Sequence, residues 1–135
     1  MVIDSSALVA VLTNEAEAYV MAEAMAADPK RLVSAVSVLE TGIVMESRYG
    51  SAGGRELDLL LHRCQIDIVS LSPEQVELAR EAYRKFGKGR HPAGLNLGDC
   101  ATYALSRSTG EPLLFKGIDF PQTDLRLVPL GFAKE

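Results

Sequence analysis

Four acidic residues occupy positions where carboxylates are unusual. Asp4 and Asp119 each follow a short apolar run, Asp99 falls in the first turn of a predicted helix, and Glu40 lies on the apolar side of another. Carboxylates held close together repel one another unless an oxygen-seeking cation such as Mg²⁺ or Mn²⁺ neutralises them. A cation of this kind activates water and stabilises charge on a phosphoryl oxygen. These acids therefore predict metal-assisted phosphodiester hydrolysis.

The sequence around Glu40 allows two helix starts. Ser37 can cap a helix in which Glu40 completes a Ser-x-x-Glu capping box. A start at Ser34 or Ala35 instead places Glu40 a turn or more inside the helix, on the same side as Ile43. A carboxylate in that apolar position needs a partner, because burying it alone is costly. The second start therefore favours a role in cation binding.

Asp4 and Asp99 also have simpler interpretations. Asp4 can cap the helix predicted at 7–12, and Asp99 can complement the dipole of a helix that Asn96 caps. Neither role prevents the same carboxylate from binding a cation.

Apolar runs bounded by turn-forming residues predict short strands separated by helices. Strands are expected at 1–3, 31–36, 65–69, 112–115 and, at the edge of the sheet, 125–130. Helices are expected at 7–12, at 15–27, from 34–37 to a Gly-rich turn at 49–54, at 55–63, at 72–86 and from 96 onward. This alternation predicts an α/β fold with a mostly parallel central sheet covered on both faces. Ligands of such sheets bind at the carboxyl ends of the strands, where Asp4 and Asp119 stand.

Length and composition indicate one soluble globular domain spanning residues 1–135. The chain is 47% hydrophobic and 24% charged, and no apolar run approaches the ~20 residues that cross a bilayer. Asp4 interrupts the start of the chain, where a signal peptide would be basic and then apolar, so we expect a cytoplasmic protein without a membrane partner. Cys64 and Cys100 form no Cys-x-x-Cys pair, which argues against a disulfide framework and a structural zinc site.

The net charge of −4 argues against a protein that coats nucleic acid, although it does not exclude a nuclease. The most basic stretch is 84–94, and it leads directly to Asp99. It is either a solvated loop or an edge that contacts RNA phosphates. In the second case Lys85, Lys88 and Arg90 are the candidate contacts.

Four segments in this order resemble the successive motifs of PIN-domain ribonucleases, in particular the VapC toxins of type II toxin–antitoxin pairs. They are Val-Ile-Asp-Ser-Ser-Ala-Leu at 2–8, Val-Leu-Glu-Thr at 38–41, Gly-Leu-Asn-Leu-Gly-Asp-Cys at 94–100 and Leu-Phe-Lys-Gly-Ile-Asp-Phe at 114–120. The resemblance implies a PIN-like three-layer α/β/α sandwich and a Mg²⁺- or Mn²⁺-dependent endoribonuclease that cleaves structured RNA such as tRNA or rRNA. It also implies a homodimer, and a cognate antitoxin whose C-terminal segment covers the active-site groove.

The resemblance assigns roles to individual residues. Asp4, Glu40 and Asp99 match the acidic triad of the family, which binds the metal, and Asp119 matches the acid of its Asp-Phe motif. Ser6 matches a small hydroxyl residue that supports the first acid through a hydrogen bond. Many relatives carry Asp or Asn immediately before the Asp-Phe acid, where this chain has Ile118. Whether Asp119 binds metal directly or through water is left open.

Two other functions fit parts of the sequence. A receiver-like phosphoacceptor domain would use Asp4 and Lys116, but the segment 68–71 lacks the acid that such domains carry after their third strand. A non-catalytic binding module would keep the fold only to pair with a partner, and the intact set of acids argues against it.

Overall fold

The computed structural model describes residues 1–130, so the part of the predicted domain at 131–135 lies outside the described residues. Its strands are β1 (Val2–Ile3), β2 (Leu32–Ser34), β3 (Asp67–Val69) and β4 (Leu113–Leu114). Its helices are α1 (Ser5–Leu12), α2 (Ala18–Ala27), α3 (Ala35–Tyr49), α4 (Ser51–Arg63), α5 (Pro73–Phe86) and α6 (Leu97–Thr109), followed by the short 3₁₀ helix η1 (Phe120–Gln122). In the described residues no helix is long and apolar enough to cross a membrane.

The strands form a parallel sheet in the order β3-β2-β1-β4. Val2 is in register with Leu32 on one side and with Leu113 on the other. The chain therefore runs outward from β1 through β2 to β3 and later returns to pair β4 with the opposite side of β1. That reversal is a topological switch point, and Asp4 follows β1 at this place.

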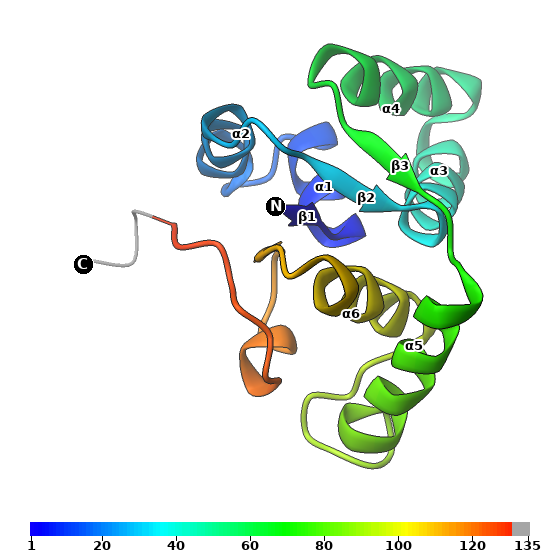
Figure 1. The fold of residues 1–135 in the computed structure, drawn as a ribbon. Coiled ribbons are helices and arrows are strands. Elements are labelled where there is room, and N and C mark those ends of the chain that lie inside the picture. Colours follow the sequence, from blue (N-terminus) through cyan, green and yellow to red (C-terminus); the bar gives the residue numbers. More distant parts are fainter. Residues whose placement is uncertain (131–135) are drawn as a thin grey trace.

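The alternation of side chains along the strands divides the core into two clusters. Ile3, Val33 and Leu114 pack on one face of the sheet with residues of α1, α2 and α4. Val2 and Leu32 point to the other face, where they pack with residues of α5 and α6. Figure 1 shows these two groups of helices on opposite sides of the strands. The prediction of a three-layer α/β/α sandwich with a mostly parallel sheet is confirmed.

The third helix starts at the earlier of the two predicted positions. Ser34 caps α3 and accepts a hydrogen bond from the Val36 N–H at 3.2 Å. Ser37 is therefore inside the helix, and a capping box formed by Ser37 and Glu40 is ruled out. Glu40 lies more than one turn into α3, as the cation-binding interpretation requires.

Two predicted segments were wrong. The turn expected at 49–54 shrinks to Gly50, whose φ of 69° ends α3, and α4 starts at the next residue because Gly53 fits against the backbone of Met45. The edge strand expected at 125–130 is reduced to one bridge between Leu113 and Leu127. It has only the two residues of β4 to pair with, and Pro129 has no N–H with which to continue the ladder.

Candidate active site

Asp4 is the most deeply buried of the four predicted acids, with 3% of its surface exposed. It is the N-cap of α1, and its Oδ2 accepts hydrogen bonds from the Ser6 N–H at 3.0 Å and the Ser6 hydroxyl at 2.6 Å. Its Oδ1 accepts a hydrogen bond from Thr102 Oγ1 on α6 at 2.8 Å. The cap and the predicted support from Ser6 are both present, and Thr102 fixes the second oxygen.

The hydroxyl groups around Asp4 form hydrogen bonds in which every proton is donated toward the Asp4 carboxylate. Each hydroxyl has a single proton to donate, and Thr102 gives its proton to Asp4. In the contact of 3.1 Å between Ser37 and Thr102, Ser37 is therefore the donor. Ser6 likewise donates to Asp4 and accepts from the backbone N–H of Lys116 at 2.9 Å. Segments from α1, α3, α6 and the loop after β4 thus converge on one carboxylate.

Glu40 reaches the start of α6. Its Oε1 accepts a hydrogen bond from the Ser5 hydroxyl at 3.0 Å, which ties the carboxylate to the residue after Asp4. Its carboxylate lies directly against Gly98, where an added methyl group would stand 2.5 Å from Oε1 and 2.6 Å from Cδ. Glycine at this position lets the Glu40 carboxylate approach the N-terminal turn of the helix, whose dipole favours negative charge.

Asp99 lies in the first turn of α6, where its carboxylate complements the helix dipole as expected. It forms a capping box with Asn96, in which Asp99 N–H donates to the Asn96 side chain at 2.9 Å and Asp99 Oδ2 accepts from Asn96 N–H at 3.0 Å. Partial burial raises the pKa of Asp99 to about 6, and the negative charges of Asp4, Asp119 and Glu40 add to the shift. Asp99 is therefore in the electrostatic field of the three other predicted acids.

Asp119 is exposed and precedes η1. Phe120 anchors this segment, because it is buried and packs edge-on against Phe115 with ring centroids 5.7 Å apart. Ile118, immediately before Asp119, is 78% exposed. The segment therefore presents Asp119 toward solvent at the same edge of the sheet as Asp4.

The donor set fits a hard divalent cation in its chemistry, because all four groups are carboxylates and at least one binds its proton more tightly because of the others. As the side chains stand, no three His, Cys, Asp or Glu residues in 1–130 are close enough to hold an ion together. Three of these carboxylates already accept hydrogen bonds from hydroxyl or backbone donors. They are Asp4, Glu40 and Asp99.

Sequence reasoning missed three contributors to this site. Thr102 follows Asp99 by three residues, which places both on one side of α6, and this spacing was the available signal. Gly98 belongs to the segment 94–100 that resembles a family motif, but the need for a residue without a side chain shows only in its contact with Glu40. Ser5 stands between Asp4 and Ser6 with no sign in the sequence that its hydroxyl holds Glu40.

A cavity of about 350 Å³ lies beside Glu40, the one of the four predicted acids that lines it. Ser5, Ser6 and Glu40 line it on one side, and the cations that line it are Arg48 and Lys116. Ser5 and Ser6 connect this cavity to Asp4, because Ser5 follows Asp4 in the chain and Ser6 donates to its carboxylate.

The basic residues predicted to contact RNA are all exposed. Lys85 is in the last turn of α5 and pairs with Glu81 at 3.6 Å, and Arg90 lies over the ring of Tyr83 at 5.2 Å from its centroid. The loop that carries Lys88 and Arg90 is closed at its base by a hydrogen bond of 2.9 Å from Lys88 N–H to the Leu95 carbonyl. It ends at Asn96, which begins α6, so the loop adjoins the helix that carries Asp99.

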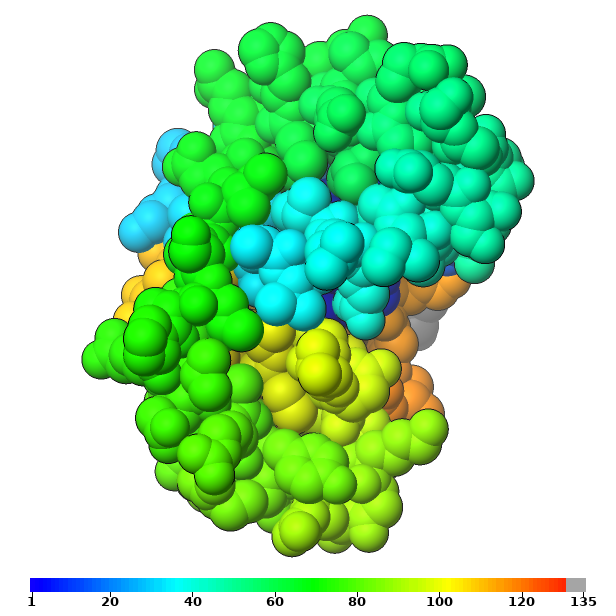
Figure 2. Space-filling model, turned by 90° about the vertical axis from the view of Figure 1, so that its right-hand side faces the viewer, coloured from blue at the N-terminus to red at the C-terminus, as the bar shows by residue number. Residues whose placement is uncertain are grey.

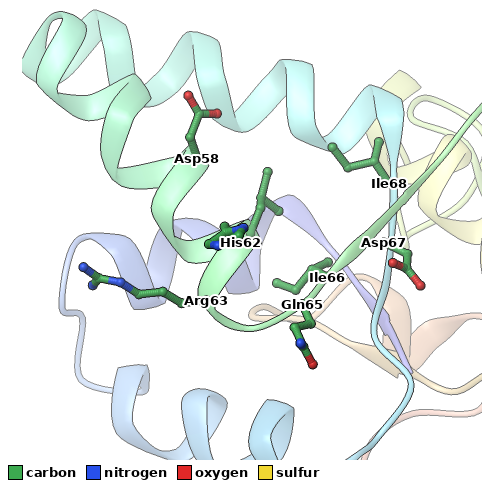
Figure 3. Close-up of a pocket in the computed structure, with 8 residues that line it drawn as sticks. Asp58, His62, Arg63, Gln65, Ile66, Asp67 and Ile68 are labelled. Atoms are coloured by element: carbon green, nitrogen blue, oxygen red, sulfur yellow. The ribbon is translucent and has the colours of Figure 1, made fainter.

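Two further hollows lie away from the Asp4 carboxylate. An apolar groove of about 680 Å³ separates α5 from the first turns of α6 and is lined by Leu71, Val76, Tyr83 and Leu97. Figure 2 shows this face, with the start of α6 (yellow) between α5 (green) and the region of β2 and α3 (cyan). A wider hollow of about 840 Å³ lies between the end of α4 and β3. Figure 3 shows Asp58 and Asp67 at its edges, and none of the four predicted acids lines it.

Comparisons with known proteins agree with this arrangement. A family model described as PIN domain matches residues 1–125. The protein named Ribonuclease VapC of Mycolicibacterium smegmatis is 56% identical over 128 residues, which cover 95% of this chain and 99% of the relative. Ribonuclease VapC30 of Mycobacterium tuberculosis is 55% identical over 130 residues, covering 96% and 99%. The crystal structure of Mycobacterium tuberculosis VapC20, described as a Sarcin-Ricin loop cleaving toxin, superimposes with a TM-score of 0.75 at 15% identity, covering 92% of this chain and 95% of that one, and shows the fold alone.

Proposed function

This chain belongs to the PIN-domain family and within it to the VapC ribonucleases, and on that premise we propose that it is a Mg²⁺- or Mn²⁺-dependent endoribonuclease. It acts as the toxin of a type II toxin–antitoxin pair, and residues 1–135 work as one ribonuclease domain. The substrate class is structured RNA such as tRNA or rRNA. The observation that carries the proposal is the buried Asp4 carboxylate, held on both oxygens by Ser6 and Thr102 beside the helix that carries Asp99.

Asp4, Asp99 and Glu40 are the residues that would hold the metal, with Asp119 beside them. When bound, the ion supplies Lewis acidity toward a phosphate oxygen and a lowered pKa for water. The raised pKa of Asp99 supports this assignment, because its cause is partial burial together with the nearby acids, and a bound cation stabilises the charged form of such a carboxylate. A proton and a cation compete for the Asp99 carboxylate, so the metal should bind more weakly as the pH falls below about 6.

The other residues of the site position the acids or bind the RNA. Ser6 and Thr102 keep the Asp4 carboxylate in one orientation. Glu40, which Ser5 holds by one oxygen, helps to hold the metal or orients the attacking water. Lys85, Lys88 and Arg90 contact RNA phosphates, and their place on the segment leading to α6 supports that role.

A cleavage assay with the purified protein tests the proposal. We expect RNA to be cut in Mg²⁺ or Mn²⁺, to survive in excess chelator, and to be cut again when the metal is restored. Cleavage that is unchanged by chelator would contradict the metal-dependent mechanism, and intact RNA in every condition would contradict the ribonuclease. Sequencing the new RNA ends would identify the substrate.

We also propose that the chain forms a homodimer through the groove between α5 and α6. Four large apolar side chains that line this groove are exposed, and Leu97 reaches 79%. Along α5 the first two turns carry Glu74 and Glu77, and the last turn carries Arg84 and Lys85. The charged residues that line the groove itself are Arg80 and Arg84. Two copies of α5 crossing antiparallel about a twofold axis would bring the acidic first turns of one helix beside these bases of the other.

Sedimentation of matched variants tests this surface. Val76→Glu and Leu97→Glu should produce monomers, and the equally apolar Ile43→Glu on α3 should not. Glu77→Arg should weaken the dimer, and combining it with Arg84→Glu should restore it. A monomeric wild-type protein, or a dimer that survives Val76→Glu and Leu97→Glu, would contradict the surface.

The cognate antitoxin is the other protein partner that we propose. Leu39 and Ile43 are exposed by 65% and 61% on the outer side of α3, one turn apart and flanking Glu40 in sequence. An antitoxin segment that covers the active-site groove would cover these side chains as well. Copurification with the product of the neighbouring small reading frame should be lost in Ile43→Asp, and copurification that is unchanged would exclude this surface.

The receiver-like alternative is less well supported than the ribonuclease. The residues after β3 are Ser70 and Leu71, so the third strand is not followed by an acid. The non-catalytic module is disfavoured by the ordered hydrogen bonds around Asp4, which a surface kept only for docking does not need.

A further inference from the structure

Lys116 connects the surroundings of Asp4 to a distant part of the chain in two ways. Its backbone N–H donates to Ser6 Oγ at 2.9 Å, and Ser6 in turn donates to Asp4. Its ammonium group forms ion pairs with Glu15 and, at 3.4 Å, with Glu17, both in the turn between α1 and α2. One residue therefore links the α1–α2 turn to the hydrogen bond that supports the first acid.

The α1–α2 turn is a firm attachment point. Thr13 Oγ1 contacts a side-chain oxygen of Glu15 at 3.0 Å and the Val9 carbonyl at 2.7 Å. The Glu15 N–H donates to the Ala10 carbonyl at 2.9 Å. The hydrogen bond from Lys116 lowers the pKa of Glu15, and Glu15 raises the pKa of Lys116, so both groups stay charged near neutral pH. The carboxylate that meets Lys116 is thus fixed to α1.

The loop that carries Lys116 has few other attachments. Residues 116–119 are exposed, and Gly117 follows Lys116 with a φ of 128°, a conformation that only glycine adopts easily. Phe115 and Phe120 anchor the ends of this segment through their mutual contact. Between these two anchors, the Ile118 carbonyl accepts a hydrogen bond from Gln122 in η1 at 3.0 Å. Lys116 ties the loop to α1 through its N–H, and to the α1–α2 turn through its ion pairs.

We propose that Lys116 is a positioning residue: its ion pairs with Glu15 and Glu17 hold the loop after β4 against the α1–α2 turn and thereby fix the N–H that orients Ser6 and, through Ser6, Asp4. The loop that Lys116 holds also carries Asp119 three residues later, so one ion pair restrains the surroundings of two acids. The effect on cleavage rests on the proposed ribonuclease function, and the effect on the loop does not.

Amide hydrogen exchange measures the positioning without any activity. In the wild-type protein the N–H at position 116 should be protected, because it donates to Ser6. Lys116→Met should speed its exchange by about tenfold or more, and Lys116→Arg, which keeps the charge, should restore most of the protection. Lys30→Met removes another exposed lysine that pairs with an acid, Glu111 at 3.5 Å, and it should leave position 116 unchanged.

Kinetics separate positioning from direct RNA binding. If Lys116 positions Asp4, Lys116→Met and Glu15→Gln should each lower kcat about tenfold with KM for RNA nearly unchanged, since a small misplacement of a reacting group has a large effect on rate. The double variant should be little worse than Lys116→Met alone, because Lys116→Met already removes the ion pair with Glu15. If Lys116 instead binds an RNA phosphate, Glu15→Gln frees it and KM falls.

The outcomes are decisive in either direction. Unchanged protection at position 116 in both Lys116→Met and Glu15→Gln would overturn the proposal, and so would a lower KM in Glu15→Gln. Loss of protection in a protein that cuts no RNA would support the positioning role and contradict the ribonuclease, so the two failures can be told apart.

Discussion

Thr102 on α6 donates a hydrogen bond of 2.8 Å to Asp4 at the end of β1, although 98 residues separate them in the chain. The hydroxyl of Thr102 also accepts a hydrogen bond from Ser37 on α3. The contact joins the layer of α6 to the central strand at the switch point of the sheet. It fixes the orientation of one carboxylate oxygen in a site where charges have to be placed accurately.

Replacing Thr102 by valine should therefore destabilise the protein. Valine has the same shape, but it leaves Oδ1 of a buried carboxylate without this donor, which costs about 1–3 kcal/mol. Urea unfolding measures the change, and Thr102→Ser, which keeps the hydroxyl, is the control. A Thr102→Val protein as stable as the serine variant would show that the hydrogen bond has no such effect.

Replacement by alanine should have different effects at two helical glycines, lowering RNA cleavage at one and raising stability at the other. At Gly98 a methyl group would collide with the Glu40 carboxylate, so Gly98→Ala should displace Glu40 and reduce RNA cleavage roughly 100-fold. At Gly42 the nearest atom is Leu57 Cδ2 at 3.7 Å, an ordinary contact, so Gly42→Ala should stabilise α3 by about 0.5–1 kcal/mol. Cleavage assays and urea unfolding on both variants check the pair. Full activity in Gly98→Ala would contradict the close approach of Glu40 to α6.

The raised pKa of Asp99 predicts a specific pH dependence of stability. The folded protein holds this proton up to about pH 6, whereas the unfolded chain releases it near 3.8, so the free energy of unfolding falls as the pH rises through that window. Asp99→Asn removes this dependence. At pH 7 and without added metal it should be more stable than the wild type by about 1 kcal/mol, because solvent screening reduces the full effect.

Unfolding of the two proteins between pH 4 and 7 isolates the contribution of Asp99. Asp58→Asn, at an exposed site on α4, makes the same change in net charge and is the control. Parallel curves for wild type and Asp99→Asn would contradict the raised pKa of Asp99.

A structural feature could be predicted from the sequence where the residues that produce it lie close together in the chain. The caps at Asp4 and Asn96 and the start of α5 at Pro73 follow from residues a few positions apart, and they were found. The contact of Thr102 with Asp4 requires α6 to pack beside β1, which no local pattern specifies.

The errors have the same origin. The Gly-rich segment after Gly50 suggests a turn, but close packing against Met45 makes small residues suitable for the first turn of α4. Leu125–Leu130 has the composition of a strand, and the length of its partner β4 decides that it makes a single bridge. The four acids could be proposed as a site because their chemistry is visible in the sequence, whereas the hydrogen bonds that orient them are not.

The most direct test of the account is the rate of RNA cleavage by Asp4→Asn relative to wild type at saturating Mn²⁺. Asparagine keeps the size of the side chain and can still cap α1, so the fold should survive, as circular dichroism would verify. Loss of the charge should lower the rate by about 1,000-fold or more, since the metal would lose a carboxylate ligand. Equal cleavage by Asp4→Asn and wild type would contradict the central claim that this carboxylate is part of the catalytic site.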